Sequence, residues 1–298
     1  MGRIEQNLNL ALIVGAFALV LIVLYTLPVS QQIKDIAQWN INAFVLFGFL
    51  GLFAFNSDSR FKNLMEISSR QEFFEKTTIG VVFGIFIFFV WGIIAQLVAG
   101  LSEAVAAAQI YNLTSSVSQI SSLSEGDAII TNLFQPVSEN FVMVVGFFIL
   151  FSVLVKVFSL NGSSRKSLRF IALIASVLAI SFIFAWIHFS VKGGSFFEFS
   201  SAGFFEFVFN TQGIGTAGYV GAFPQLILGV LWLAITIYFN DWVVGAVAHL
   251  INNLLSIYFI TGALHASSLI VVIALVLIIF KSVSSNEINF KGNVEVLQ

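Results

Sequence analysis

The sequence predicts an all-α integral membrane protein with about eight transmembrane helices, and three observations lead to this prediction. Of the 298 residues, 58% are hydrophobic and only 9% are charged, whereas soluble globular domains carry about 25% charged residues. The hydrophobic residues form separate runs, most of which can cross a hydrocarbon core of about 30 Å at about 1.5 Å per helical residue. Because backbone groups in lipid must be satisfied internally, and the short alternating strands of a membrane barrel are absent, the runs are expected to be helices.

The predicted spans follow one another at regular intervals. In chain order they cover residues 8–27, 41–55, 78–101, 133–158, 168–191, 222–239, 242–260 and 265–280. No small-residue cleavage site follows the first run, so we expect a retained span rather than a cleaved signal peptide. Only Asn240 and Asp241 separate the sixth and seventh spans, which predicts a very tight turn. No second domain is evident, and residues 1–298 are expected to form a single polytopic membrane domain.

The distribution of Lys and Arg predicts the orientation of the chain. With eight spans, eleven of the 13 basic residues fall on the side of the N-terminus, and only Lys34 and Lys192 fall on the other. Cytoplasmic loops carry the excess of Lys and Arg, so we expect a multi-pass cell membrane protein with both termini in the cytoplasm. The connection 102–132, which has no Lys or Arg, is expected outside.

Several classes of function are excluded by what the sequence lacks. Without cysteine there are no disulfides, thiolate metal sites or cysteine nucleophiles. The chain also lacks the Gly-x-Ser-Gly of a rhomboid-type serine site, the aspartate motifs of a presenilin-type site and the His-Glu-x-x-His of a zinc helix. Membrane lipid is an expected partner, and nucleic acid is not.

Four polar residues inside the predicted spans are candidates for function, because such groups are costly in lipid. Glu139 lies in the first turns of the fourth span, and His188 near the end of the fifth. The topology places both at similar depth near the outer side. His249 and Asn253 are four residues apart in the seventh span, so they share one helix face. A polar intramembrane cavity would unite a carboxylate–imidazole pair that activates water with a His/Asn pair that donates hydrogen bonds to an oxyanion.

Each candidate also has a purely structural explanation. Glu139 follows a proline at a helix start, where the helix dipole favours a carboxylate. His188 fits an interfacial histidine, and His249 with Asn253 fits a pair that makes hydrogen bonds between helices. The third histidine, His265, begins the last span and is expected at the interface.

The second and third helices of this set carry motifs that resemble a known family. The chain resembles the CAAX protease and bacteriocin-processing membrane family, also called the CPBP or Abi family, in which three helices carry Glu-Glu-x-x-x-Arg, Phe-x-x-x-His and His-x-x-x-Asn. Phe184 and His188 match the second motif, whereas His249 and Asn253 match the third, with a further asparagine at Asn252. The order and spacing of the motifs, and their places on helices, carry the resemblance.

The first motif departs from the family pattern. Glu139 matches its leading glutamate, but Asn140 stands in place of the second glutamate and Val144 stands where the arginine is expected. The resemblance covers about residues 130–260, which would form a CPBP-like helical core.

The resemblance implies an intramembrane endopeptidase that cleaves a membrane-associated peptide or protein. In that family the leading glutamate and the second-motif histidine activate water, so Glu139 would be the base and His188 its partner. His249 and Asn253 would then donate to the oxyanion, with no cofactor required. A zinc ion held by Glu139, His188 and His249 is the alternative. The alternative function is a non-catalytic CPBP-like protein that binds a peptide, a lipid or a partner helix in the same cavity.

Overall fold

The computed structural model describes only part of the chain, in which all the regular secondary structure is helical. The described residues are 42–43, 45–48, 50–51, 63–65, 69–101, 134–160, 165–191, 223–261 and 266–284. They contain no strand, as predicted for an all-α protein. The first predicted span, the long connections 102–132 and 192–221, and His265 lie outside the described residues.

Six helices carry the architecture. They are α4 (Arg70–Leu101), α7 (Gln135–Val157), α8 (Lys166–Val191), α10 (Phe223–Phe239), α11 (Trp242–Thr261) and α12 (Ala266–Ser284). Within α4, α7 and α8, three segments are long and apolar enough to cross a membrane: Gln71–Val90, Gln135–Val157 and Lys166–Trp186. The apolar stretches described in α10, α11 and α12 are shorter.

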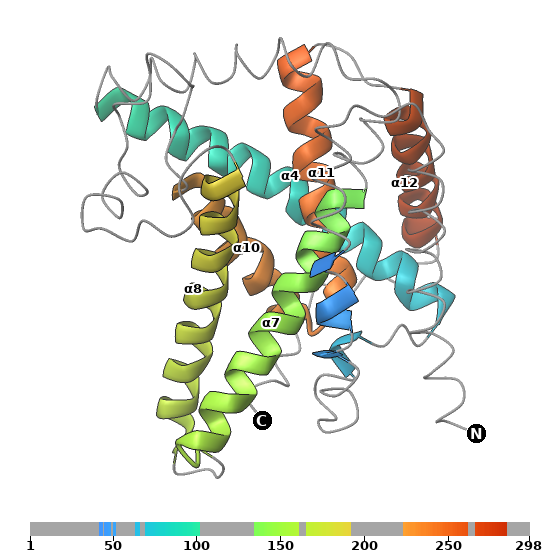
Figure 1. Cartoon of the computed structure of the whole chain (residues 1–298). Helices are drawn as coiled ribbons and strands as arrows, with labels where there is room; N and C mark the ends of the chain where they lie inside the picture. The colour runs from blue at the N-terminus through green and yellow to red at the C-terminus, as the bar shows by residue number, and fades with distance from the viewer. Residues whose placement is uncertain are drawn as a thin grey trace.

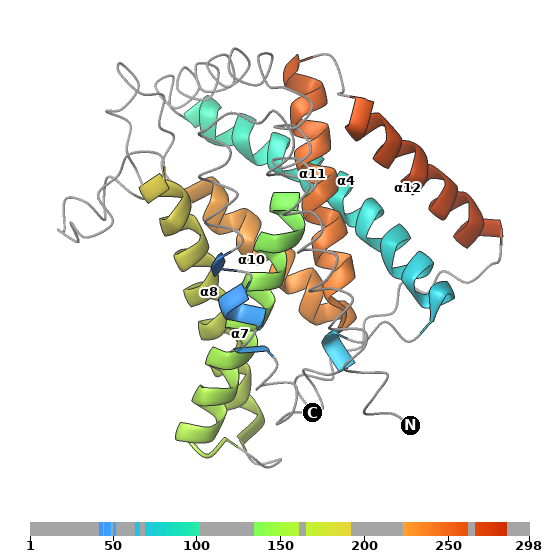
Figure 2. The same ribbon diagram turned by 45° about the vertical axis from the view of Figure 1, so that its right-hand side comes forward.

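The helices pack around α11. Helices α7 and α8 form an antiparallel hairpin, and α10 packs against α8, α7 and α11 (Figures 1 and 2). Helix α11 also contacts α7 on one side and α4 on another, and α12 packs against α4. In both views α7 and α12 run toward the lower side of the molecule, whereas α4 and α8 run away from it.

Helix α4 begins earlier than its apolar run predicts. The predicted span starts at residue 78, but the helix starts at Arg70. Ser69 caps this end, because its Oγ accepts a hydrogen bond from the backbone N–H of Glu72 at 3.1 Å. Serine followed three residues later by glutamate is a helix-start pattern, so the charged first turns belong to the helix although they add nothing to the apolar run.

The tight turn predicted between the sixth and seventh spans is confirmed. Asn240 adopts a left-handed conformation with φ of 50°, which asparagine tolerates better than most residues. The backbone N–H groups of Asn240 and Asp241 donate to the carbonyls of Ile237 and Thr236 at 3.2 and 3.0 Å, the pattern of a Schellman helix end. The Asp241 carboxylate then accepts from the N–H of Val243 at 2.7 Å, so it starts α11.

Two glycines allow α4 to lie directly against the backbone of α11. A Cβ atom on Gly80 would lie 2.8 Å from the carbonyl oxygen of Val244, and one on Gly84 would lie 2.8 Å from that of Ala248. Glycines four residues apart on an apolar helix are typical of close helix contacts in membranes. Helix α4 therefore packs directly against the first two turns of α11.

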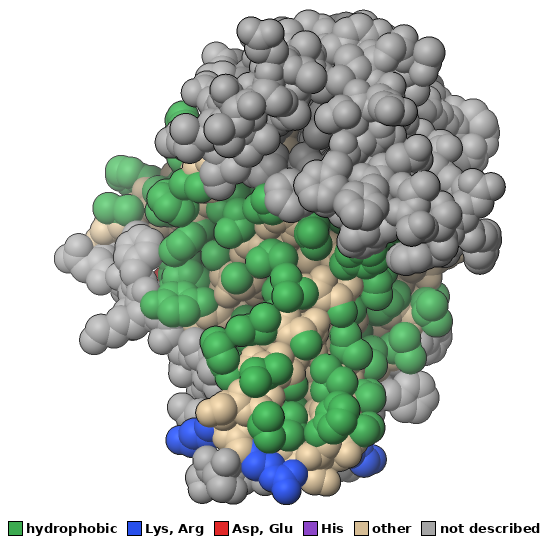
Figure 3. Space-filling view, turned by 90° about the vertical axis from the view of Figure 1, so that its left-hand side faces the viewer, with side chains coloured by type: hydrophobic (Ala, Val, Ile, Leu, Met, Phe, Trp, Pro, Cys, Tyr) green, Lys and Arg blue, Asp and Glu red, His purple; other side chains and the backbone are tan. Residues whose placement is uncertain are grey.

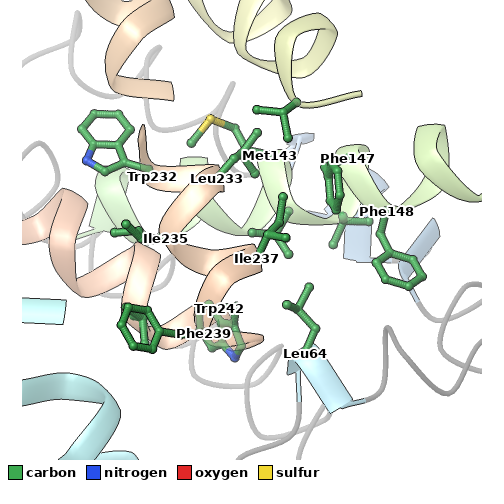
Figure 4. Close-up of a cluster of buried hydrophobic side chains, with 14 of the residues drawn as sticks. Leu64, Met143, Phe147, Phe148, Trp232, Leu233, Ile235, Ile237, Phe239 and Trp242 are labelled. Atoms are coloured by element: carbon green, nitrogen blue, oxygen red, sulfur yellow. The ribbon is translucent and has the colours of Figure 1, made fainter. Parts of the chain in front are cut away.

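A single large cluster of buried apolar side chains joins α7, α10 and the start of α11 (Figure 4). Its fully buried members include Phe147, Phe148 and Leu233. The Phe147 and Phe151 rings are stacked with centroids 5.8 Å apart. This cluster fixes α10 and α11 against the hairpin and so positions their polar residues.

The outer face of α8 is apolar, with basic residues at one end. Large exposed side chains along it include Ile171, Ile174 and Leu178. Figure 3 shows this face, with a broad hydrophobic area that ends at a group of Lys and Arg side chains. Arg165 lies in this end region and donates to the carbonyl oxygens of Phe158 and Ser159 at 3.0 and 2.9 Å, so it caps α7.

Candidate functional site

The candidate site centres on a carboxylate and an imidazole from two different helices. Oε2 of Glu139, in the second turn of α7, lies 3.8 Å from Nε2 of His249, in α11. The His249 side chain is only 3% exposed and that of Glu139 is 12% exposed. This separation is too long for a direct hydrogen bond, but a water molecule can bridge two such atoms.

The pair forms because the start of α7 packs on the start of α11. The side-chain amide of the fully buried Asn140 donates to the carbonyl oxygen of Trp242 at 3.4 Å. The next residue, Phe141, meets the Trp242 ring edge-on, with centroids 6.2 Å apart. These contacts fix the level at which α7 meets α11, so that Glu139 lies within reach of a residue two turns further along α11.

Gln135 orients the carboxylate. Its Nε2 donates to Oε1 of Glu139 at 2.6 Å across one turn of α7. Since Oε1 is held in this way, the contact with His249 is made by the other oxygen, Oε2. The same carboxylate therefore has one oxygen that accepts a fixed hydrogen bond and one that faces the imidazole.

Two aromatic side chains enclose the imidazole. The Trp232 ring, from α10, stacks on the His249 ring with centroids 3.5 Å apart and an interplanar angle of 16°. The Phe184 ring, from α8, meets His249 edge-on at 6.3 Å and Trp232 edge-on at 5.9 Å. The imidazole therefore has a fixed plane, set by residues from two other helices.

Glycines explain why these rings can approach. A Cβ on Gly229 would lie 3.3 Å from the Phe184 ring, so its absence lets α10 lie close to α8. A Cβ on Gly245 would lie 3.1 Å from the carbonyl oxygen of Trp232 and would clash with Thr236. One turn beyond Gly245, the next residue on that face of α11 is His249, which reaches the Trp232 ring.

The described residues bring together some of the predicted site residues. His249 contacts both Glu139 and Phe184, as given above. Asn252 is buried and Asn253 is half-buried, one turn beyond His249. The backbone places His188 one turn beyond Phe184 on the same side of α8, but its side chain lies outside the described residues. The predicted pairing of Glu139 with His188 therefore stays a prediction.

The two departures from the family's first motif are packing residues here. Asn140 contacts Trp242 and lies against Gly245, where a Cβ would come within 3.0 Å of its Nδ2. Val144, one turn further, has no exposed surface. These positions connect α7 to its neighbours, although the Oδ1 atom of Asn140 has no hydrogen-bond partner among the described residues.

Sequence reasoning missed Gln135, Trp232 and the packing role of the glycines. Gln135 had a usable signal, because a glutamine and a glutamate four residues apart on a helix are neighbours. The Gly80 and Gly84 pair had the spacing of a membrane helix contact. Trp232 had no signal, since a tryptophan in an apolar run is expected to pack, and only the fold brings it to His249.

The described part of the chain contains two of the three side chains that the zinc alternative requires. No group of three His, Cys, Asp or Glu residues able to hold a metal occurs among the described residues. Glu139 and His249 would supply two of the three ligands of the zinc alternative, and the third, His188, has no described side chain. The zinc alternative therefore stays a prediction.

A second buried carboxyl lies at the turn between α10 and α11. Burial raises the pKa of Asp241 from 3.8 to about 7. The hydrogen bond from Val243 and the charge of Lys76 act in the opposite direction, and the charge of Glu72 adds to the increase. Asp241 therefore has a raised pKa near neutral pH, and the charges that act on it lie in the first turns of α4.

Comparison with known proteins adds no relative. No family model, no curated protein and no solved structure matches this chain. The function is therefore argued from the geometry of Glu139, His249 and the side chains around them.

Proposed function

We propose that the chain is a multi-pass membrane endopeptidase that uses Glu139 to activate water beside His249. The contact between these two side chains, at 3.8 Å in the helical interior, is the observation that carries the proposal. A carboxylate that faces an imidazole is a combination that hydrolytic enzymes use to move protons. The apolar surface of the described helices supports a substrate that is itself associated with the membrane.

The geometry supports separate roles for Glu139 and His249 during peptide hydrolysis. Oε2 of Glu139 takes a proton from water, and the water oxygen forms a bond to the carbonyl carbon. Nε2 of His249, when it carries a proton, donates to the oxyanion on that same carbon. The proton on Glu139 then passes to the amide nitrogen as the carbon–nitrogen bond breaks. The water and the oxyanion are bonded to one carbon, so the base and the donor must lie close together, as Glu139 and His249 do.

The resemblance to the CPBP family supports this reaction class. Phe184 of the second motif and His249 of the third are in ring contact. Helical spacing carries His188 and Asn253 one turn beyond these two residues, on the same sides of their helices. Under this proposal, His188 assists Glu139 and Asn253 is a second oxyanion donor.

The proposal includes an eight-span topology with cytoplasmic termini. Three candidate spans lie within α4, α7 and α8. The directions of the helices support the topology, because α7 and α12 run one way and α4 and α8 run the other (Figure 1). Lys76 and Lys166 belong to the first turns of α4 and α8, and Lys156 and Lys281 to the last turns of α7 and α12.

A non-catalytic binding protein is the second candidate, and one observation favours it. Asn140 and Val144 occupy the positions of the family's second glutamate and arginine, and both serve helix packing here. A relative without catalytic function would retain the polar interior and bind a peptide, a lipid or a partner helix there.

Glu139→Gln separates the two candidates. The variant removes the proton acceptor while it keeps the shape and polarity of the side chain. In proteoliposomes that carry the full chain and hydrophobic peptides of varied sequence, cleavage is expected to fall about 10²–10⁴-fold. Glu75→Gln, at the start of α4, is the control and should cleave normally. Full turnover with Glu139→Gln would refute the endopeptidase, and absence of cleavage together with Glu139-dependent peptide binding would favour the non-catalytic candidate.

A further inference from the structure

Trp232 carries a buried donor that the helix packing does not use. Its side chain is 2% exposed, and its indole Nε1 has no hydrogen-bond partner among the described residues. A buried indole N–H usually finds an acceptor, because a buried donor without one loses the hydrogen bond that it would make with water. Helix packing alone therefore does not explain why an indole N–H is buried at this position.

The donor lies beside the imidazole of the candidate site. Because the Trp232 and His249 rings are stacked with centroids 3.5 Å apart and nearly parallel, the indole ring that carries this donor lies directly against the imidazole. Nε2 of the same imidazole lies 3.8 Å from the carboxylate of Glu139. An unused N–H donor, an imidazole and a carboxylate thus come from three helices to one place.

The indole ring is in contact with aromatic side chains from two other helices. It stacks on the His249 ring, and the Phe184 ring meets it edge-on with centroids 5.9 Å apart. Within α10, Thr236 donates to the carbonyl oxygen of Trp232 at 2.8 Å, which is a contact of the backbone that carries the indole. A donor fixed before a ligand arrives binds it without the entropic cost of ordering a side chain.

The protein contains a natural comparison in Trp242. Its indole Nε1 also has no hydrogen-bond partner among the described residues, and the residue is 8% exposed. Its ring, however, packs edge-on against Phe141 rather than on an imidazole. Trp242 therefore matches Trp232 in chemistry and burial and differs in its position relative to the site.

We infer that Trp232 is a ligand-binding residue of the Glu139–His249 site, whose indole N–H donates a hydrogen bond to a carbonyl oxygen of the bound group. The stacked Trp232 ring also fixes the plane of the His249 imidazole, so that Nε2 of His249 can contact the same bound group. The inference rests on the proposed function for the nature of that group, an amide carbonyl that becomes a tetrahedral oxyanion. It adds a donor that the resemblance to the CPBP family does not assign.

The indole resonances of the unaltered full chain test the inference in detergent. The probe is a hydrophobic peptide aldehyde, whose hydrate carries the oxygens of a tetrahedral intermediate. With ¹⁵N-labelled tryptophan, the Trp232 indole N–H resonance is expected to shift when the aldehyde is added, and the Trp242 resonance is expected to stay in place. Binding of the aldehyde with no shift at Trp232 would overturn the inference, as would a complete failure to bind.

Matched variants give the second measurement. Trp232→Phe keeps an aromatic ring against His249 but removes the N–H, and should weaken aldehyde binding about tenfold, the effect of one hydrogen bond. Trp242→Phe removes the same group elsewhere. It leaves the backbone carbonyl that accepts from Asn140 and keeps an aromatic ring against Phe141, so the packing of α7 on α11 is retained and the aldehyde should bind normally. Equal affinity in Trp232→Phe and the unaltered protein would overturn the inference. If cleavage still depends on Glu139 in that case, the proposed function stands without it.

Discussion

At the scale of the residue, the two oxygens of Glu139 have different environments. One accepts a hydrogen bond from Gln135 at 2.6 Å, and the other faces His249 at 3.8 Å. A carboxylate at a helix start is also favoured by the helix dipole, and this structural explanation remains compatible with the position. The dipole does not explain the neighbouring imidazole, which comes from a helix 110 residues further along the chain.

Asp241 predicts a pH dependence of stability at the same scale. Burial raises its folded-state pKa from 3.8 to about 7. Between these values the unfolded chain loses the proton while the folded chain keeps it, so stability falls as pH rises from about 4 to 7. Above pH 7 the loss is complete and amounts to at most about 4 kcal/mol.

Asp241→Asn should remove this dependence. Its amide oxygen still accepts the hydrogen bond from Val243, and it has no charge to desolvate. We expect a higher melting temperature than that of the unaltered protein at pH 8, and a smaller difference between pH 5 and pH 8. Thermal unfolding in detergent measures both. An equal decrease between pH 5 and pH 8 in the two proteins would show that another group controls it.

At the scale of the element, glycines set the distances between helices. Gly80 and Gly84 bring α4 against α11, Gly229 brings α10 against α8, and Gly245 brings α11 against α10. Close contact between backbones replaces the hydrophobic driving force that lipid does not supply. The aromatic contacts around His249 depend on these distances.

Gly84→Ala should destabilise the protein through a single methyl group. That methyl would lie 2.8 Å from the carbonyl oxygen of Ala248, so α4 and α11 must separate. Overpacking of this kind typically costs about 1–3 kcal/mol, which would lower the melting temperature in detergent. Gly48→Ala is the matched control, because none of the described residues lies within 4 Å of the added methyl. Equal melting temperatures for the two variants would contradict the packing account.

The sequence predicted the elements better than their contacts. The ends of α7, α8, α10 and α11 agree with the predicted spans within a few residues, because apolar runs and polar breaks are local features. The start of α4 was missed, since a Ser69 cap is not apolar. Which residue lies next to Glu139 depends on the offset between α7 and α11 along their axes. The contact between Asn140 and Trp242 sets this offset, and no pattern in the sequence near Glu139 predicts it.

At the scale of the whole molecule, the exposed surface of the described helices suits lipid. Exposed large hydrophobic residues occur along α4, α8 and α12, among them Phe86, Ile171 and Leu277. In Figure 3 the basic side chains gather at one end of the apolar face. This division supports the predicted orientation, with the ends of α7 and α12 toward the cytoplasm.

The absence of cysteine makes this orientation directly testable. In the cysteine-free chain, Ser167→Cys at the start of α8 and Ser121→Cys in the connection 102–132 give one reactive thiol each. With a membrane-impermeant maleimide on intact cells, the thiol at 121 should react and the thiol at 167 should react only after permeabilisation. Labelling of both positions from the same side would rule out the eight-span topology.

The central claim is that Glu139 and His249 act together on one substrate. A double-mutant cycle measures this directly, with Glu139→Gln, His249→Asn and the double variant compared with the unaltered protein in peptide cleavage. Residues that act as a unit have strongly non-additive effects. We therefore expect the double variant to cleave about as fast as the slower single variant. Rate losses that multiply in the double variant, or a single variant with normal turnover, would contradict the claim.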